Sequence, residues 1–162
     1  MKEIDLSLGY TAIVDDEDYD TLSRFNWLAR KCKSGRVYAI RHRTLNGKTE
    51  WTYMHRMLMS PGAGMVVDHI DGNGLNNAKA NLRICTFAQN IRNSKIRVGC
   101  SSKYKGVCWD KKASNWRARI MINGRLTSLG SFDSEESAGM AYDTAAISNY
   151  GEYASTNGLV TK

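Results

Sequence analysis

Long apolar segments and paired cysteines are what this sequence has least of. No run of about 18 apolar residues occurs in the 162-residue chain, so no transmembrane helix is expected. The first residues, MKEIDLSLGY, contain no apolar signal-peptide core, and we therefore expect the protein in the cytoplasm of its host. The four cysteines form no Cys-x-x-Cys pair, which argues against a structural zinc site because such sites need closely spaced ligand pairs.

Positive charge is abundant and unevenly distributed. The formal net charge of +7 and the pI near 9.3 suggest a polyanionic partner. Residues 30–56 contain eight basic residues and one acidic residue, and residues 103–127 contain seven basic residues and one acidic residue, whereas residues 1–29 and 128–162 are acidic overall. A single charged block is commonly only a solvated face, but two basic blocks on strand-like sequence make that reading less favoured.

The first half of the sequence predicts a small sheet with short helices. The segment YTAIV predicts a strand, and acidic residues after it predict a short helix opened by Asp15 or Asp16. The turn Asn46-Gly47 predicts a hairpin that ends near Tyr53, followed by a short helix that Pro61 terminates.

A strand–loop–strand–helix pattern follows within about 30 residues. Strands are predicted at 65–69 and 82–86, separated by a loop rich in Gly and Asn, and a helix begins near Thr86. This order can bring the end of the first strand, Asp68-His69, against Asn90 on the helix. Carboxylate and amide oxygens suit Mg²⁺ or Mn²⁺, and a His can deprotonate a water near neutral pH. The pattern therefore predicts a site for phosphodiester hydrolysis with one divalent ion.

The second half predicts a sheet of three strands followed by one helix. Residues 93–103 are polar and basic and are expected to form a linker. The runs YKGVCWD, NWRARIMI and RLTSLGSF alternate as strands do, and Asn123-Gly124 predicts a hairpin between the last two. Asp133 and Glu136 have capping-box spacing, an alanine-rich face marks the helix, and Gly151 is expected to end it.

The residues VDHIDG (67–72), Asn76-Asn77, Asn81-Leu82-Arg83 and Gln89-Asn90 resemble the ββα-metal motif of HNH endonucleases, the phage and intron-homing kind. The resemblance covers about residues 50–95. It implies that His69 is the general base, that Asp68 and Asn90 are metal ligands, and that Asn81 tethers the loop and orients the base. It also implies a bacterial or phage-infected host cell. A DHxDG turn could instead be only a tight loop, and the loop residues Asp71, Asn73, Asn76 and Asn77 are expected to shape the turn rather than act in catalysis.

Residues 103–158 resemble the plant ethylene-response-factor type of DNA-binding domain, through the runs YKGV, WRARI, LGSF and AYDTAA and the closing Gly151 and Asn157. The resemblance implies that the sheet, and not the helix, enters the major groove. The acidic charge of the helix and tail agrees, because phosphates would repel it. Cys108, Asp110 and Met121 depart from the plant pattern, so plant target sequences are not transferred.

The resemblances and the basic segments together give the residues expected to contact DNA. In the first half these are Arg41, Arg43, His55 and Arg56, although a packed helix histidine is an equal alternative for His55, and His42 is expected to be an ordinary strand residue. In the second half they are Lys105, Trp109, Lys111, Arg117, Arg119, Arg125 and Thr127, while Trp116 is expected to pack between sheet and helix.

We therefore expect an α+β protein in two parts. Residues 1–95 would form a small antiparallel sheet with the ββα-metal nuclease unit (about 64–95), residues 96–102 a linker, and residues 103–158 a three-stranded antiparallel sheet packed on one helix. The predicted function is metal-dependent cleavage of double-stranded DNA at a selected site, as a monomer or a transient dimer on DNA, with no membrane partner. The alternatives are a non-catalytic DNA-binding regulator with an inactive nuclease fold and, more weakly, an RNA-binding protein.

Overall fold

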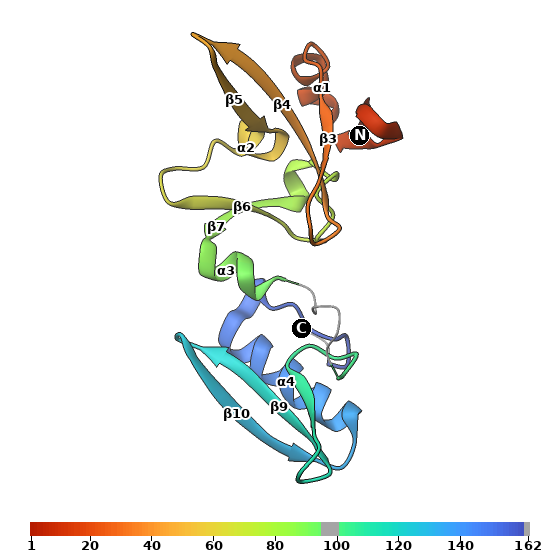
Figure 1. Ribbon diagram of the computed structural model, residues 1–162, viewed down its shortest axis with the longest axis vertical. Coiled ribbons are helices and arrows are strands. Elements are labelled where there is room, and N and C mark those ends of the chain that lie inside the picture. Colours follow the sequence, from red (N-terminus) through yellow and green to blue (C-terminus); the bar gives the residue numbers. More distant parts are fainter. Residues whose placement is uncertain (95–100, 161–162) are drawn as a thin grey trace. The chain divides into compact units, whose positions relative to one another are not determined.

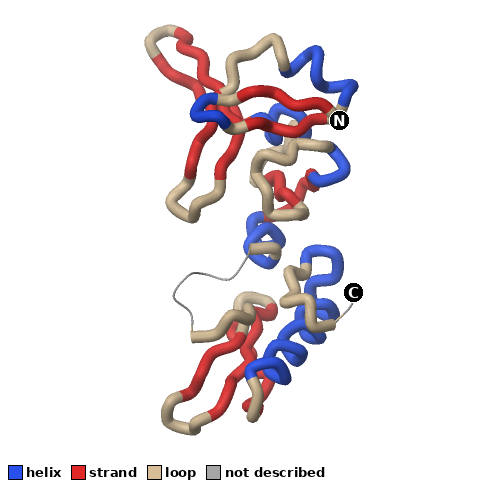
Figure 2. The backbone as a smooth tube through the Cα atoms, turned by 90° about the vertical axis from the view of Figure 1, so that its right-hand side faces the viewer, coloured by secondary structure: helices blue, strands red, loops and turns tan. Residues whose placement is uncertain are grey.

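The computed structural model describes residues 1–94 and 101–160 of the chain. The chain divides into two compact units, Met1–Asn90 and Ile91–Lys162, which are taken one at a time below (Figure 1). The fold class is α+β, as predicted, with several small antiparallel sheets and short helices between them (Figure 2). The proposed division at 95 and 103 stays a prediction, and residues 96–100 of the expected linker, with Cys100, lie outside the described residues.

The first unit begins with a two-stranded sheet, β1 (Lys2–Asp5) and β2 (Thr11–Val14), joined through the short helix η1 (Ser7–Gly9). Helix α1 (Asp16–Leu22) follows, and its N-cap is Asp15, one of the two residues expected there. The buried side chains of this part pack into one core with those of the neighbouring sheet: Ile4, Leu6, Ala12, Val14, Leu22, Trp27, Ala39 and Met54.

The second sheet has the strand order β3 (Leu28–Lys31), β4 (Val37–Leu45), β5 (Lys48–Tyr53), and all pairs are antiparallel. The predicted hairpin is confirmed, because Asn46 and Gly47 take the φ values 50° and 73° that a tight turn between two twisted strands requires. Neither β1 nor β3 was predicted from the sequence. Helix α2 (Met54–Met59) continues directly from β5.

The ββα unit consists of β6 (Met65–His69), β7 (Leu82–Thr86) and α3 (Phe87–Arg92), with the short helix η2 (Lys79–Asn81) before β7. Both strands have the predicted bounds. Thr86 caps α3 as expected: its hydroxyl accepts from the Gln89 N–H at 3.3 Å, and the Gln89 side chain accepts from the Thr86 N–H at 2.8 Å. These reciprocal bonds fix the direction in which the helix leaves β7.

The long loop between β6 and η2 is attached to the N-terminal elements. The Ile13 N–H of β2 donates to the Leu75 carbonyl, and the Asn77 N–H donates to the Ile13 carbonyl at 2.7 Å. The carboxylate of Asp15 accepts from the Lys79 N–H at 2.7 Å, and the Lys79 ammonium pairs with Glu17 and Asp18. The first elements of the chain therefore hold the loop that carries the candidate site.

The second unit contains the strands β8 (Val107–Asp110), β9 (Asn115–Ile122) and β10 (Arg125–Phe132), in the order β10-β9-β8, packed on helix α4 (Glu135–Tyr150), which the short helix η3 (Gly151–Tyr153) follows. The predicted alanine face of α4 is confirmed: Ala138 and Ala146 are fully buried against the sheet, and Gly151 ends the helix. The N-cap is Ser134, whose hydroxyl accepts from the Ser137 N–H, so the predicted Asp133–Glu136 capping box is wrong by one position.

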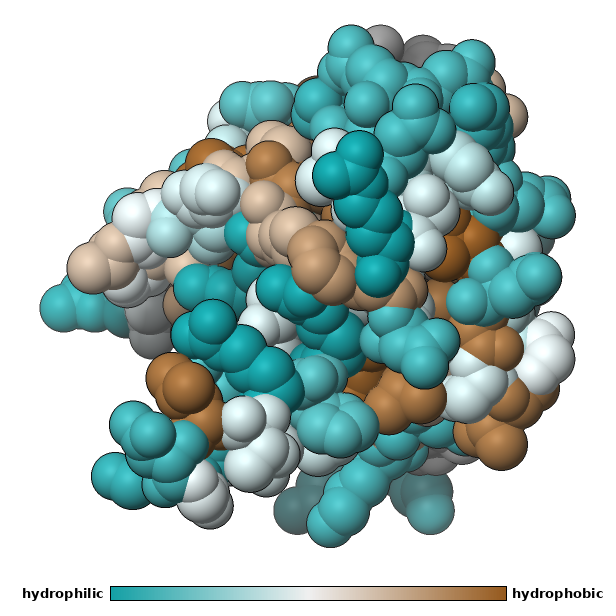
Figure 3. Space-filling view, turned by 90° about the horizontal axis from the view of Figure 1, so that it is seen from above, coloured by the Kyte–Doolittle hydropathy of each residue, from teal (hydrophilic) through white to brown (hydrophobic). Residues whose placement is uncertain are grey.

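One face of the molecule is seen in the space-filling view. The view from above shows hydrophilic residues over most of the face, with hydrophobic residues in separate areas between them (Figure 3). Within residues 1–94 and 101–160, no helix is both long enough and apolar enough to cross a membrane.

Candidate active site and DNA interface

Asp68 and His69 lie at the end of β6, and both side chains are buried. In the register of the ββ pair Asp68 is directly opposite Arg83 of β7. The Nε and Nη2 groups of Arg83 donate to the same oxygen of Asp68, at 3.0 and 2.8 Å. Because the pair is almost out of solvent, each charge depends on the other, and Arg83 fixes the orientation of the carboxylate.

The His69 ring is oriented by Asn77. The ring Nε2 lies 3.4 Å from the side-chain oxygen of Asn77, which is 1 % exposed. The amide nitrogen of Asn77 donates to the Leu75 carbonyl, so its oxygen must face the imidazole. This orientation favours the tautomer of His69 that has its proton on Nε2 and its lone pair on Nδ1.

Asn81 holds the loop after His69 in place. Its side-chain oxygen accepts from the Asp71 N–H at 3.1 Å, and its amide nitrogen donates to the Asp71 carboxylate and the Asn76 carbonyl at 3.0 and 2.9 Å. Burial acts to raise the pKa of Asp71, but hydrogen bonds from Asn73, Asn76 and Asn81 outweigh it and lower that pKa. Asp71 is therefore a charged centre of the loop, and Asn81 is its tether; a direct part of Asn81 in catalysis stays a prediction.

His55, at the start of α2, lies beside His69. The two ring centroids are 5.0 Å apart with the planes nearly perpendicular, and the rings of Tyr38 and Tyr53 lie 5.7 and 5.2 Å from His55. His55 is 8 % exposed, and its Nδ1 has no hydrogen-bond partner within the described residues. His55 is therefore a packed histidine, the second of the two possibilities given by the sequence, and it is packed within the candidate site.

Both imidazoles are held in the neutral form. Burial lowers the pKa of His55 to about 3, with the charges of His69 and Arg56 acting in the same direction. Burial also lowers the pKa of His69, although the hydrogen bond to Asn77 and the carboxylates of Asp71 and Asp68 oppose it; Arg36 lowers it further. A neutral imidazole at pH 7 can accept a proton, which a general base must do.

Asn90 lies on α3, half-buried, and its side chain makes no hydrogen bond to the described residues. Within residues 1–94 and 101–160, no group of three or more His, Cys, Asp or Glu side chains could hold a metal ion. The expected ligand pair, one carboxylate (Asp68) and one amide oxygen (Asn90), is smaller than such a group and stays a prediction. These hard oxygen donors fit Mg²⁺ or Mn²⁺, and a zinc-type set of nitrogen and sulfur ligands is not formed there.

Three of the arginines expected to bind DNA in the first unit differ in their surroundings. The Arg41 guanidinium lies 3.8 Å from the centre of the Phe25 ring, and Arg43 pairs with Glu50 at 2.7 Å. Arg56 is exposed on α2. The first two side chains already have partners, and binding of DNA by Arg41 and Arg43 stays a prediction.

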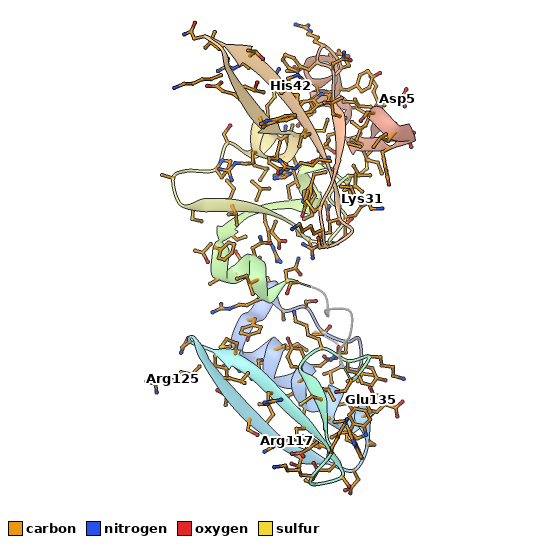
Figure 4. The ribbon with its side chains drawn as sticks, viewed as in Figure 1. Asp5, Lys31, His42, Arg117, Arg125 and Glu135 are labelled. Atoms are coloured by element: carbon orange, nitrogen blue, oxygen red, sulfur yellow. The ribbon has the colours of Figure 1, made fainter. Side chains whose placement is uncertain are left out.

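The candidate DNA-binding residues of the second unit fall on two sides of the sheet. Residues opposite each other in an antiparallel pair have their side chains on the same side. Arg117 and Arg119 are exposed and alternate with the buried Ala118 and Ile120, so they face away from α4. Three other candidates lie on the side that faces α4, because each is opposite a residue on that side. They are Trp109 (opposite Trp116), Arg125 (opposite Ile122) and Thr127 (opposite Ile120). Figure 4 marks Arg117 and Arg125 on this sheet.

The remaining side chains of this set have distinct positions. Lys105 is half-buried, and its ammonium donates to the carbonyls of Arg92 (2.7 Å) and Ser94; burial lowers its pKa to about 8. Its expected contact with DNA phosphate stays a prediction, but its charge is turned toward backbone carbonyls. Lys111 is exposed in the β8–β9 turn. Trp116 packs against the cluster between sheet and helix, as predicted.

Comparison with known proteins places these two units in known families. The HNH endonuclease family model matches residues 59–92, and the AP2 domain model matches residues 102–152. An uncharacterised HNH endonuclease of Acanthamoeba polyphaga mimivirus is 32 % identical over 154 residues, which are 92 % of this chain and 75 % of the relative. The chain belongs to the HNH endonuclease family. It carries an AP2 domain in its second unit.

Other relatives match only one part of this HNH protein. Protein 3.8 of Escherichia phage T7 is 36 % identical over 81 residues, which are 50 % of this chain and 67 % of the phage protein. APETALA2-like protein 2 of Oryza sativa subsp. indica is 39 % identical over 57 residues, which are 35 % of this chain and 13 % of the rice protein. The match to the rice protein agrees with the expected fold of the second unit, a sheet packed on one helix.

Four residues that lie near the candidate site were not predicted from the sequence to be part of it. Asn77 was taken as a turn residue, yet it contacts the His69 ring. Arg83 could have been found from the register alone, because a hairpin that aligns 69 with 82 aligns 68 with 83. Tyr38 and Arg36 come from the β3–β4 region, far away in sequence, and only the tertiary fold brings them to His69.

Proposed function

We propose that this HNH protein cleaves DNA by metal-dependent hydrolysis of a phosphodiester, at a site selected in part by the AP2 domain, as a homing endonuclease does. The observation that carries the proposal is the buried, neutral His69 beside Asp68 at the end of β6. A turn needs neither residue, and burying both costs free energy unless their interactions offset it.

His69 acts as the general base. Its Nδ1 lone pair takes a proton from a water molecule while the water oxygen attacks phosphorus and the 3′ oxygen of the DNA leaves. Asn77 keeps the Nε2 proton in place, so the ring presents one defined nitrogen to the reaction. General-base catalysis of this kind typically contributes about 10²–10⁴-fold to the rate.

Asp68 and Asn90 would hold one divalent ion. When bound, Mg²⁺ or Mn²⁺ neutralises charge on the phosphoryl group and on the leaving oxygen. Arg83 supports this arrangement by fixing the Asp68 carboxylate through two N–H donors. Asn81 supports it by tethering the loop through Asp71.

The non-catalytic regulator is the alternative, and a plasmid assay separates the two. The full chain is incubated with supercoiled plasmid in Mg²⁺, in Mn²⁺ and in EDTA. The proposal requires conversion to the nicked or linear form in at least one metal and none in EDTA. Binding of the plasmid without any metal-dependent cleavage would favour the regulator. Because each chain has one site, a nick is expected from one chain, and a double-strand break only if two chains cooperate.

A further inference from the structure

The two sides of the sheet β3–β4–β5 differ in chemistry. The side that carries Ala39 and Arg41 is turned to the core: Ala39 is 1 % exposed within the cluster that contains Trp27 and Met54, and Arg41 lies over Phe25. Further along the same side, Arg43 is paired with Glu50 directly across the hairpin. Arg41 and Arg43 on this side therefore already have partners, whereas Lys31 and Lys48, opposite Val37 and Leu45, are exposed there.

The other side of the sheet carries an aromatic surface. Along β4, Tyr38, Ile40 and His42 alternate with Ala39 and Arg41, so their side chains point to the other side. The residues opposite them are Arg30 (opposite Tyr38), Tyr53 (opposite Ile40) and Trp51 (opposite His42). We call the set Arg30, Tyr38, Tyr53, His42 and Trp51 the aromatic face. Figure 4 labels His42 on β4 within it.

The aromatic face is continuous with the active site. The Tyr38 ring lies 5.8 Å from the His69 ring, Tyr53 lies 5.9 Å from Tyr38, and the Arg30 guanidinium lies 5.9 Å from the centre of the Tyr53 ring. Farther along the strands the rings of His42 and Trp51 lie 4.9 Å apart. The face thus extends from the catalytic base toward the end of the hairpin.

The far end of this face is exposed to solvent. Trp51 is 52 % exposed, and His42 is also exposed. Arg30, opposite Tyr38 at the end near His69, is exposed as well. A large aromatic side chain contributes little to the fold when it is half in water, because the benefit comes from apolar area removed from solvent. An exposed ring on a face that also carries Arg30 has the composition of a surface that packs against a nucleic acid.

We propose that the aromatic face, and not the side with Arg41 and Arg43, binds the DNA duplex next to the scissile phosphate. This inference rests on the proposed nuclease function, because it takes His69 as the point of cleavage. A two-stranded ribbon such as β4–β5 fits the major groove of B-DNA. Arg30, opposite Tyr38, supplies a positive charge on this face that complements the charge of the phosphates. The fit of the ribbon to the groove favours a duplex over a single strand.

The strand geometry gives the distance to be tested. Tyr38 and His42 are four residues apart, which corresponds to about 13 Å along an extended strand. A step along duplex DNA is about 3.4 Å. Trp51, opposite His42, should therefore lie on the order of four base pairs from the cleaved bond, on one side of it only.

Site-directed photo-crosslinking tests the face directly. A photoreactive amino acid is placed in the full chain either at position 51 or at position 50, which is exposed on the other side of the same strand. Each protein is irradiated with a long labelled duplex in EDTA, so that no cleavage is needed. A much higher yield from position 51, mapping a few base pairs from the nick that the wild-type protein makes in Mg²⁺, is the expected result. Equal or higher yield from position 50 would overturn the proposal.

The nicking kinetics of a Trp51 variant give a second test, which uses no crosslinker. Trp51→Ala should raise the KM for plasmid nicking by about tenfold, as the loss of one well-packed aromatic contact at an interface does, and leave kcat nearly unchanged. Glu50→Ala is the matched control and should not raise KM. An unchanged KM in Trp51→Ala, or competition by single-stranded DNA as strong as by duplex, would contradict the assignment. Loss of metal-dependent nicking by the wild-type protein would instead refute the proposed function, while the crosslinking result in EDTA would still report on the surface.

Discussion

The orientation of His69 depends on one buried amide. Asn77 is 1 % exposed and is fixed by its own bonds to the Leu75 and Ile13 carbonyls, so it can hold the imidazole without moving itself. A base that is held in this way loses less freedom when it meets its substrate. Asn77 is therefore a positioning residue, and its effect should be visible in the pH dependence of the rate.

Substitution of Asn77 tests that role. Asn77→Asp puts a carboxylate beside His69, which should raise the pKa of the imidazole. Because the base must be neutral, the acidic limb of the nicking rate should move to higher pH. Asn77→Ala should lower the rate by about tenfold or more, as loss of outer-shell partners commonly does. A pH–rate profile that is the same for wild type and Asn77→Asp would contradict the assigned contact.

His55 gives a prediction about stability. Its pKa is about 3 in the folded protein and ordinarily about 6.5, so the unfolded chain binds the proton more readily between these values. The stability is complete above about pH 6.5 and should fall by up to about 1.4 kcal/mol per pH unit as the pH drops toward 3. His55→Phe, which keeps a buried ring, should remove this part of the slope. Urea unfolding at several pH values measures it, and equal slopes for both proteins would refute a buried neutral His55.

At the scale of elements, the loop after His69 is fitted closely to the β3–β4 hairpin. A Cβ atom on Gly74 would lie 2.4 Å from the Val37 carbonyl oxygen and 2.6 Å from the Tyr38 ring. The first of these atoms is backbone, so it cannot rotate away. Since Tyr38 also touches the rings of His55 and His69, the fit at Gly74 links the hairpin to the site.

Gly74→Ala should therefore be harmful. We expect a loss of about 1–3 kcal/mol in the free energy of unfolding, together with reduced nicking because Tyr38 is displaced. Gly62→Ala is the matched control, since a Cβ atom there meets nothing within 4 Å. Denaturant unfolding and the plasmid assay measure both effects. A Gly74→Ala protein as stable as Gly62→Ala would show that the contact is not close.

In the AP2 domain, the side of the sheet away from α4 carries Arg117 and Arg119. Replacing both with Ala should weaken duplex binding and reduce the slope of log Kd against log salt by about two. Arg125→Ala, which changes a position on the helix side, should have a smaller effect. Gel-shift titration at several salt concentrations measures both. A larger effect of Arg125→Ala would mean that the other side of the sheet meets DNA.

The sequence predicted local elements better than contacts between them. The turns at Asn46-Gly47 and Asn123-Gly124 were predictable because they need positive φ, and both are present. The ββα strands were predictable from short apolar runs bounded by loop residues. Strand β3 was not predicted because its sequence, LARK, has neither alternating apolar residues nor a continuous apolar run. His55 could not be assigned between packing and function because its neighbours Tyr38 and His69 come from other elements. The N-cap of α4 is Ser134, one residue after the predicted Asp133, because both residue types are good N-caps and the sequence does not distinguish them.

At the scale of the whole molecule, the chain joins a nuclease unit and a DNA-binding domain. Joining two binding units raises the effective concentration of one when the other is bound, without new contacts. In the proposed function, the AP2 domain selects the DNA and the HNH unit supplies the chemistry. The central claim is that His69 supplies this chemistry and is not needed for binding.

The most direct measurement compares wild-type protein and His69→Ala in two assays on the same plasmid. In Mg²⁺ or Mn²⁺ the nicking rate should fall by about 10²-fold or more in the variant, because the general base is removed. In EDTA the gel-shift affinity of the two proteins should be equal within about twofold, because the AP2 domain is untouched. Nicking by His69→Ala at the wild-type rate would contradict the account.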